Sequence, residues 1–226
     1  MAIKKIRIAL DCDGCIVDLL PQWLSMYNQE TNENLQVSDI KEWDLFSQVK
    51  QPKILNKILL SKGFFQKPEP YLDVLEVLPK LLKDERFDIF IATQVPRSSP
   101  YAGWDKREWL RKWLPEFDLE KFISIHHKYL LRADVILDDH PRHLKQWLEE
   151  DGTRTAICMD HLYNKKAVHS ARVYSWKGFE ERMELQWNTV WNPPKSKGCN
   201  QHEDCSKKEK SSECCHDVCC TDCFGY

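Results

Sequence analysis

Short apolar runs alternate with amphipathic stretches along most of the chain. Apolar runs rich in β-branched and aromatic residues are typical of buried strands, and they occupy residues 3–10, 87–92, 122–125, 134–137 and 154–158. Apolar residues at helical spacing predict helices over residues 71–83, 104–113, 141–150 and 175–187. Strands that alternate with helices predict an α/β protein with a Rossmann-like, mainly parallel sheet and helices on both faces.

Two of these helices carry apolar positions that we expect to face the core. The helix over residues 71–83 has a leucine stripe formed by Leu72, Leu75, Leu78 and Leu82. Pro79 falls inside the stripe and should bend or split the helix. The helix over residues 104–113 has three tryptophans at helical spacing, which are Trp104, Trp109 and Trp113.

Residues 18–70 interrupt the alternation of strands and helices. Helical spacing occurs near both ends of this segment, around Trp23 and around Ile58, and an aromatic and acidic stretch over residues 37–46 lies between. We therefore predict a small helical insertion after the first strand. The α/β core is then expected to consist of residues 1–17 and 71–190.

The composition indicates an ordinary globular protein and excludes several functions. The chain has 226 residues, 42% of them hydrophobic, and a formal net charge of −2. This balance gives no support for binding a nucleic-acid polymer or a membrane surface, and no apolar run approaches the roughly 18 residues that a membrane span needs. The basic N-terminus leads directly into a strand-like run, so we expect no signal peptide and a cytoplasmic location.

Cysteines concentrate at the end of the chain, in a segment that we predict to be a separate tail, residues 191–226. Three of the ten cysteines lie in the body, and seven are Cys199, Cys205, Cys214, Cys215, Cys219, Cys220 and Cys223. A cytosolic location favours metal binding or free thiols over disulfides. The spacing of Cys219 or Cys220 to Cys223 suits Zn²⁺, but adjacent cysteines leave several ligand sets open, and a disordered, reactive tail is the alternative.

Four expected strands end in polar residues that can do chemistry. These residues are Asp11 and Asp13, Thr93, Lys128, and Asp138 and Asp139. Alternation along a strand sends Asp11 and Asp13 to the same side, although an Asp-Gly turn explains that stretch alone equally well. Ligands bind at the carboxyl ends of the strands in parallel sheets, so we expect the six side chains to form one site.

Clustered carboxylates with no neutralising charge would repel one another, which calls for a cation. Oxygen ligands favour Mg²⁺ over zinc, and Mg²⁺ favours sites that also hold a phosphate. Lys128 and the Thr93 hydroxyl suit phosphate oxygens. Metal and lysine together would neutralise a transferring phosphoryl group, while one aspartate attacks phosphorus and the other handles a proton.

The ordered set of Asp-x-Asp-Gly, a strand-end Thr, a Lys and Asp-Asp resembles the haloacid dehalogenase (HAD) phosphatase superfamily. The likeness extends to the 5′(3′)-deoxyribonucleotidase family over about residues 5–188, through segments 62–70, 90–93, 128–139 and 175–176. Two positions depart from that family. Gln94 and Val95 stand where the family has Ser before Pro, and His127 precedes the lysine where Asp is common.

The resemblance implies a role for each residue. Asp11 is the nucleophile and a Mg²⁺ ligand, and Asp13 is the general acid and base and binds metal through its backbone carbonyl. Thr93 and Lys128 bind the phosphate, Asp139 ligates the metal directly, and Asp138 does so directly or through water. The insertion becomes a cap over the site. Trp43 and Phe46 are candidates for the substrate pocket, with packing between cap helices as the alternative.

We therefore predict a Mg²⁺-dependent phosphomonoester hydrolase that removes phosphate from (deoxy)nucleoside monophosphates through an aspartyl-phosphate. A HAD phosphatase for another small phosphomonoester is one alternative. A non-catalytic metal-binding protein that acts through its Cys-rich tail is the other, and the complete set of site residues argues against it. The expected partner is a small nucleotide, with no nucleic-acid polymer and no membrane. The sequence leaves open whether the chain forms a homodimer.

Overall fold

The computed structural model describes residues 5–191 and shows a six-stranded parallel sheet in the order β5-β4-β1-β6-β7-β8. The strands are β1 (Ile6–Leu10), β4 (Phe87–Thr93), β5 (Phe122–Ser124), β6 (Val135–Asp138), β7 (Thr155–Met159) and β8 (Ala171–Val173). The predicted α/β class and parallel sheet are confirmed. The short edge strand β8 has no counterpart among the predicted strands.

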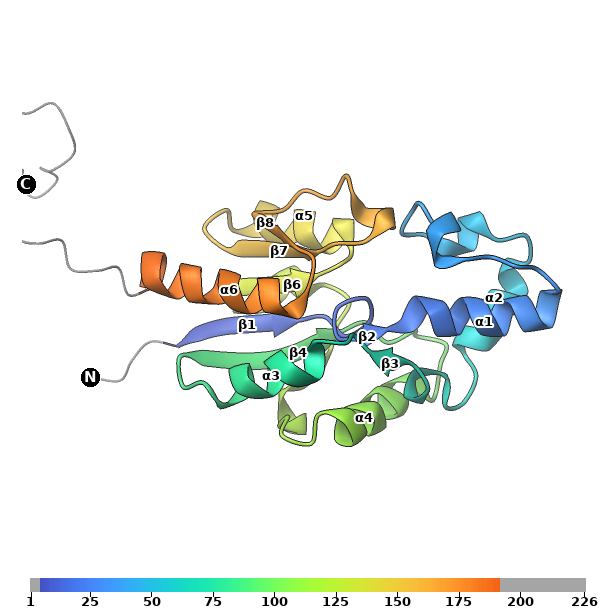
Figure 1. Ribbon diagram of the computed structural model, residues 1–226, viewed down its shortest axis with the longest axis horizontal. Coiled ribbons are helices and arrows are strands. Elements are labelled where there is room, and N and C mark those ends of the chain that lie inside the picture. Colours follow the sequence, from blue (N-terminus) through green and yellow to red (C-terminus); the bar gives the residue numbers. More distant parts are fainter. Residues whose placement is uncertain (1–4, 192–226) are drawn as a thin grey trace, which may run out of the picture.

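Helices cover both faces of this sheet (Figure 1). Helices α3 (Val74–Lys83), α4 (Ala102–Trp113) and α6 (Trp176–Gln186) pack on one face with inward residues such as Leu10, and α5 (Pro141–Glu150) packs on the other with residues such as Ala9. Local sequence sets the helix starts. Pro141 stands at the first turn of α5, and the Ser175 hydroxyl accepts a hydrogen bond from the Gly178 amide at the start of α6, as N-caps do.

The helical cap inserted after the first strand is confirmed. It contains α1 (Leu19–Thr31), α2 (Pro52–Leu59) and three 3₁₀ turns, Val37–Asp39, Leu45–Gln48 and Phe64–Gln66. A two-stranded antiparallel ribbon, β2 (Val17–Asp18) with β3 (Glu69–Pro70), joins the cap to the core. The cap has its own apolar cluster and lies beyond the carboxyl end of β1 (Figure 1).

The expected leucine stripe of α3 is partly wrong. Leu72 is fully exposed, because the helix begins only at Val74, and Leu75 is 39% exposed. The buried positions of α3 are Val74, Val77, Leu78 and Leu81. Pro79 does not split the helix, which is continuous across it.

The expectation for the three tryptophans is also partly wrong. Trp109 is buried and Trp113 packs against the core, but Trp104 is 62% exposed. Trp104 lies on the outer side of α4, because the buried side of this helix is formed by Ala102, Asp105, Lys106, Trp109 and Leu110.

The position of β1 explains where a site can form. The chain moves from β1 outward through β4 to β5, and then returns to the other side of β1 for β6, β7 and β8. Such a reversal of strand order opens a crevice at the carboxyl ends of the central strands.

The expected Cys-rich zinc tail lies outside the described residues. Among the helices that are described, none combines the length and the apolar character that a membrane span requires.

Candidate active site

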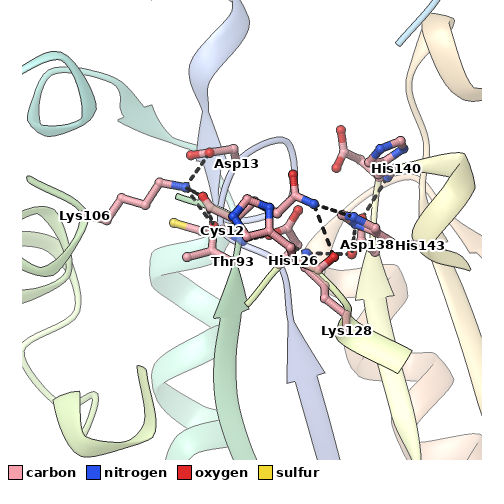
Figure 2. Close-up of polar contacts among 12 residues, drawn as sticks. Cys12, Asp13, Thr93, Lys106, His126, Lys128, Asp138, His140 and His143 are labelled. Carbon is pink, nitrogen blue, oxygen red and sulfur yellow. Dashed lines mark hydrogen bonds and ion pairs between the residues drawn. The ribbon is translucent and has the colours of Figure 1, made fainter. Parts of the chain in front are cut away.

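Lys128 contacts two of the predicted aspartates, Asp11 and Asp138, at the carboxyl end of β1; Figure 2 labels Lys128 and Asp138. Leu10 pairs with Leu137 in the sheet, so the next residues, Asp11 and Asp138, emerge side by side. The Lys128 Nζ lies 2.7 Å from Asp11 Oδ1 and 2.7 Å from Asp138 Oδ2. Burial alone would lower the pKa of this lysine, but the two carboxyl groups raise the pKa above its usual range. The ammonium therefore stays charged and is held by both aspartates.

The carboxyl group of Asp11 has one oxygen held and one free. Its Oδ1 accepts a hydrogen bond from the Cys12 amide at 2.8 Å and lies against the Lys128 ammonium. Within residues 5–191, Oδ2 has no hydrogen-bond partner, and Asp11 lines a cavity under the cap. A fixed carboxylate with a free oxygen facing a cavity is the geometry that a nucleophile needs.

A second lysine, Lys106 of α4, organises the other side of the site (Figure 2). Its Nζ lies 2.6 Å from Asp13 Oδ2, donates to the Thr93 hydroxyl at 2.7 Å and donates to the Gln94 carbonyl at 2.9 Å. The side chain is 1% exposed. Burial alone would lower the pKa of Lys106, but the Asp13 carboxylate and the other anionic groups around it raise the pKa above the ordinary value.

Sequence reasoning missed Lys106. It lies on a helix between two expected strands and follows no strand end, so its sequence neighbourhood resembles any polar helix face. The one available signal is that Lys106 and Trp109 have helical i, i+3 spacing and therefore lie on the same side of α4. Trp109 was expected in the core, which places Lys106 on the inward side.

The two adjacent aspartates at the carboxyl end of β6 have different surroundings. Asp138 is fully buried behind the site, where Lys128 and His143 contact its carboxyl group. Burial would raise the pKa of Asp138, but these two partners lower it well below its usual range. Asp139 lines the cavity together with Asp11, Asp13 and Gly14. The cavity-facing carboxyl group is therefore that of Asp139.

A side-chain network includes Gln94, one of the two positions where the sequence departs from the resembled family. His143 Nδ1 lies 3.1 Å from Asp138 Oδ2, and its Nε2 lies 3.0 Å from Gln94 Nε2. Because the amide nitrogen must donate and the carboxylate must accept, the imidazole carries its proton on Nδ1. Gln94 also donates to the His126 carbonyl at 3.3 Å. His126 lines the cavity, and His127 is exposed outside it.

The charges of the site leave room for a cation. Asp11, Asp13, Asp138 and Asp139 bring four carboxyl groups together, and in the part of the chain that the structure describes the lysines paired with them are Lys106 and Lys128. Burial is the largest cause that raises the pKa of both Asp11 and Asp139, and repulsion from neighbouring carboxylates adds to it. Two uncompensated negative charges on oxygen donors suit a divalent, oxygen-binding ion such as Mg²⁺. Asp11, Asp138 and His143 also come close enough to share an ion, but Lys128 already contacts both carboxyl groups.

The cavity between cap and core has a volume of about 520 Å³ and is lined by residues of both. Both predicted pocket residues line it. Phe46 packs edge-on against Trp23 at 5.7 Å between ring centroids. Trp43 is 44% exposed and stacks on His140, with ring centroids 3.7 Å apart and an interplanar angle of 6°. Burial lowers the pKa of His140 to about 3, so the stacked ring is neutral.

Solved structures with this arrangement of elements are HAD-like hydrolases. A HAD family hydrolase from Deinococcus radiodurans with bound phosphate and sodium has a TM-score of 0.55 at 12% identity, and the match covers 86% of this chain and 100% of that one. The HAD hydrolase YfnB from Bacillus subtilis bound to magnesium has a TM-score of 0.52 at 12% identity, and covers 80% and 99%. At this identity the likeness establishes the fold, which is that of the HAD-like hydrolases.

Sequence comparison gives the particular family. Residues 4–188 match the family described as 5′ nucleotidase, deoxy (Pyrimidine), cytosolic type C protein. A 5′(3′)-deoxyribonucleotidase from Clostridium acetobutylicum is 27% identical over 179 residues, which cover 77% of this chain and 92% of that protein. One from Bacillus subtilis is 24% identical over 185 residues, covering 80% and 99%. The chain belongs to this nucleotidase family, and the resemblance seen in the sequence is confirmed.

Proposed function

We propose that the chain is a Mg²⁺-dependent phosphomonoester hydrolase that acts on (deoxy)nucleoside monophosphates through an aspartyl-phosphate. The observation that carries the proposal is the Asp11 carboxyl group. Lys128 fixes one of its oxygens, and the other faces the cavity beside Asp13, Thr93 and Lys106. Family membership supports the nucleotide substrate.

The Mg²⁺ ion would be held by Asp11, the Asp13 carbonyl and Asp139. The raised pKa values of Asp11 and Asp139 support this assignment, because a cation would relieve the repulsion that causes part of the shift. Bound there, the ion would supply positive charge to the phosphoryl oxygens. Asp138 would act from behind, through Lys128 and through water.

The reaction would proceed in two displacements. Asp11 attacks phosphorus, the bond from phosphorus to the nucleoside oxygen breaks, and Asp13 gives its proton to that oxygen. Water then attacks the phosphorus of the aspartyl-phosphate, Asp13 takes the proton of the water, and inorganic phosphate leaves Asp11. Lys128 and the Thr93 hydroxyl would hold phosphoryl oxygens throughout. Lys106 would keep the Asp13 carboxylate and the Thr93 hydroxyl in place beside them.

The nucleoside would occupy the cavity between cap and core. Trp43 and Phe46 supply aromatic surface there, and their lining positions support the predicted role in substrate binding. The exposed part of Trp43 offers a face for a base or sugar. We assign the cap, expected over residues 18–70, the task of covering the reacting groups.

The test is phosphate release by the full chain from a panel of deoxynucleoside and ribonucleoside monophosphates, with 5′ and 3′ phosphates and small sugar phosphates, in Mg²⁺ and in EDTA. We expect Mg²⁺-dependent release from nucleotides and loss of at least about 10³-fold in Asp11→Asn. Asp88→Asn, which removes a surface carboxyl group paired with Lys121, is the matched control and should keep full activity. Release from sugar phosphates alone would redirect the proposal to another substrate. No release, with Asp11→Asn equal to wild type, would overturn it.

A further inference from the structure

The loop that follows β7, residues 160–164, touches both sides of the proposed metal position. The Tyr163 hydroxyl donates a hydrogen bond to Asp139 Oδ2 at 2.8 Å. His161 Nε2 donates to the carbonyl oxygen of Gly14 at 2.6 Å. Gly14 directly follows Asp13, whose own carbonyl belongs to the neighbouring peptide group. One short loop therefore contacts both segments that would ligate the ion.

This loop is itself held firmly. Asn164 is buried, and its amide nitrogen donates to the backbone carbonyls of Asp139 at 2.9 Å and of Met159 at 2.8 Å. Its side-chain oxygen accepts from the His161 amide at 3.0 Å and from Arg172 at 2.9 Å. The loop is therefore tied to the backbone of Asp139 as well as to its carboxyl group.

The rings of His161 and Tyr163 support each other. They stack at 4.8 Å between centroids with an interplanar angle of 10°. The Tyr163 hydroxyl is the donor of its contact to Asp139, because a carboxylate oxygen can only accept. Side chains with locked rotamers can orient a ligand more accurately than mobile ones.

Gly14 shows how closely these groups meet. Its φ is +74°, and a Cβ at this position would lie 2.5 Å from Asp139 Oδ2 and 3.1 Å from the Tyr163 hydroxyl. The turn after Asp13, the Asp139 carboxyl group and the Tyr163 hydroxyl are therefore packed against one another. Within residues 5–191, Oδ1 of Asp139 has no hydrogen-bond partner, so Tyr163 occupies one oxygen and leaves the other for an ion.

We propose that Tyr163 and His161 are positioning residues for the metal ligands: Tyr163 fixes the Asp139 carboxyl group, and His161 fixes the Gly14 carbonyl and with it the turn that presents the Asp13 carbonyl. This inference rests on the proposed Mg²⁺-dependent function. It assigns to the loop a role in metal affinity.

The first test is Tyr163→Phe in the full chain, which removes one oxygen atom and keeps the ring stack. Mg²⁺ binding is measured directly by isothermal titration calorimetry, and the Mg²⁺ concentration for half-maximal phosphate release is measured alongside. We expect both constants to rise about 10- to 100-fold, as for other groups that orient metal ligands, while kcat at saturating Mg²⁺ falls much less. Tyr174→Phe, at a 76% exposed tyrosine, is the control and should bind Mg²⁺ like wild type.

The second test uses His161, where a conservative variant can restore the contact. The side-chain amide of glutamine can donate to the Gly14 carbonyl as the imidazole does. We therefore expect His161→Ala to weaken Mg²⁺ binding and His161→Gln to recover most of it. A purely structural role would lower the thermal midpoint in these variants and leave the Mg²⁺ affinity of the folded protein unchanged.

The failure of this inference and that of the proposed function are distinguishable. Unchanged Mg²⁺ affinity in Tyr163→Phe and His161→Ala, with an active wild type, would overturn the loop's role and leave the hydrolase intact. Weakened Mg²⁺ binding in both variants, with no phosphate release by wild type, would support the loop's role and overturn the hydrolase. A wild type that binds no Mg²⁺ would overturn the loop's role outright.

Discussion

Replacing Lys106 with methionine tests whether the lysine that the sequence did not reveal belongs to the reaction. The substitution keeps a long, flexible side chain and removes the ammonium group that contacts Asp13, Thr93 and the Gln94 carbonyl. Lys106 also lies over the Phe65 ring of the cap, at 4.9 Å from its centroid. The variant therefore removes a positive charge that contacts Asp13 and Thr93 in the core and the Phe65 ring in the cap.

The structure gives the size of the expected effect. Breaking a fully buried ion pair costs about 3–5 kcal/mol because it leaves an unpaired charge. The Asp13 side chain is 28% exposed, so water can reach its carboxylate, and the lost stability should be smaller, about 1–3 kcal/mol. Loss of one fixed group that stabilises transition-state charge typically costs about 10²- to 10³-fold in kcat. We therefore expect kcat to fall far more than the loss of unfolding free energy alone would explain.

The assay is steady-state phosphate release at saturating Mg²⁺, with the unfolding free energy measured by denaturant in parallel. Lys121→Met is the matched control, because Lys121 also lies 2.6 Å from a carboxylate, that of Asp88, but on the surface. Exposed pairs contribute little, so the control should keep its kcat within twofold. A folded Lys106→Met protein with kcat within threefold of wild type would refute the reasoning.

Three further outcomes are expected. Burial and carboxylate repulsion raise the pKa of Asp11 and Asp139 in the folded state. The folded state therefore binds more protons than the unfolded state, and the free energy of unfolding in EDTA should fall as pH rises from about 4 through the raised pKa values. Denaturant midpoints from about pH 5 to pH 8 check this, and a slope unchanged by saturating Mg²⁺ would contradict it. Gly14→Ala should abolish Mg²⁺-dependent activity. Gly63→Ala is the control, because Gly63 has a similar φ of +75° and nothing lies near its Cβ, so it should cost only about 1–2 kcal/mol of folding stability. Equal losses of activity in the two variants would count against the close contact at Gly14. Trp43→Ala should lower kcat/KM about tenfold for nucleotides, because it removes about 1.4 kcal/mol of aromatic contact. It should leave kcat/KM for a phosphomonoester without a nucleobase unaffected. Equal losses for both substrates would argue for a packing role.

Hydrophobic periodicity and short apolar runs in the sequence predicted most of the fold. A short apolar run followed by a polar residue marks the end of a strand. Sequence alone therefore indicates Asp11, Thr93, Lys128 and Asp138 as candidate site residues. Helix phase was less predictable. The stripe through Leu72 assumed a helix that starts three residues too early, and one turn of error moves a leucine from the core to solvent.

Contacts between distant segments were not predictable in this way. Lys106 meets a carboxyl group 93 positions away, and Tyr163 meets one 24 positions away. Neither residue stands at a strand end, and the i, i+3 spacing of Lys106 to Trp109 places it on the inward side of α4 without indicating what it meets there. Their roles depend on how α4 and the loop after β7 are folded over the sheet, which no local periodicity encodes.

The distribution of positive charge around the four aspartates divides the site into two sides. Lys106 pairs with Asp13, and Lys128 is shared by Asp11 and Asp138. Asp139 has a tyrosine hydroxyl on its carboxyl group in place of a lysine. Since a cation is stabilised most where negative charge is least compensated, we expect the ion on the Asp139 side of the site. The free oxygen of Asp11 is then left for the phosphoryl group, on the side where Lys106 holds the Asp13 carboxylate and the Thr93 hydroxyl. The same asymmetry explains why a substitution at Tyr163 should act on metal affinity and one at Lys106 on kcat.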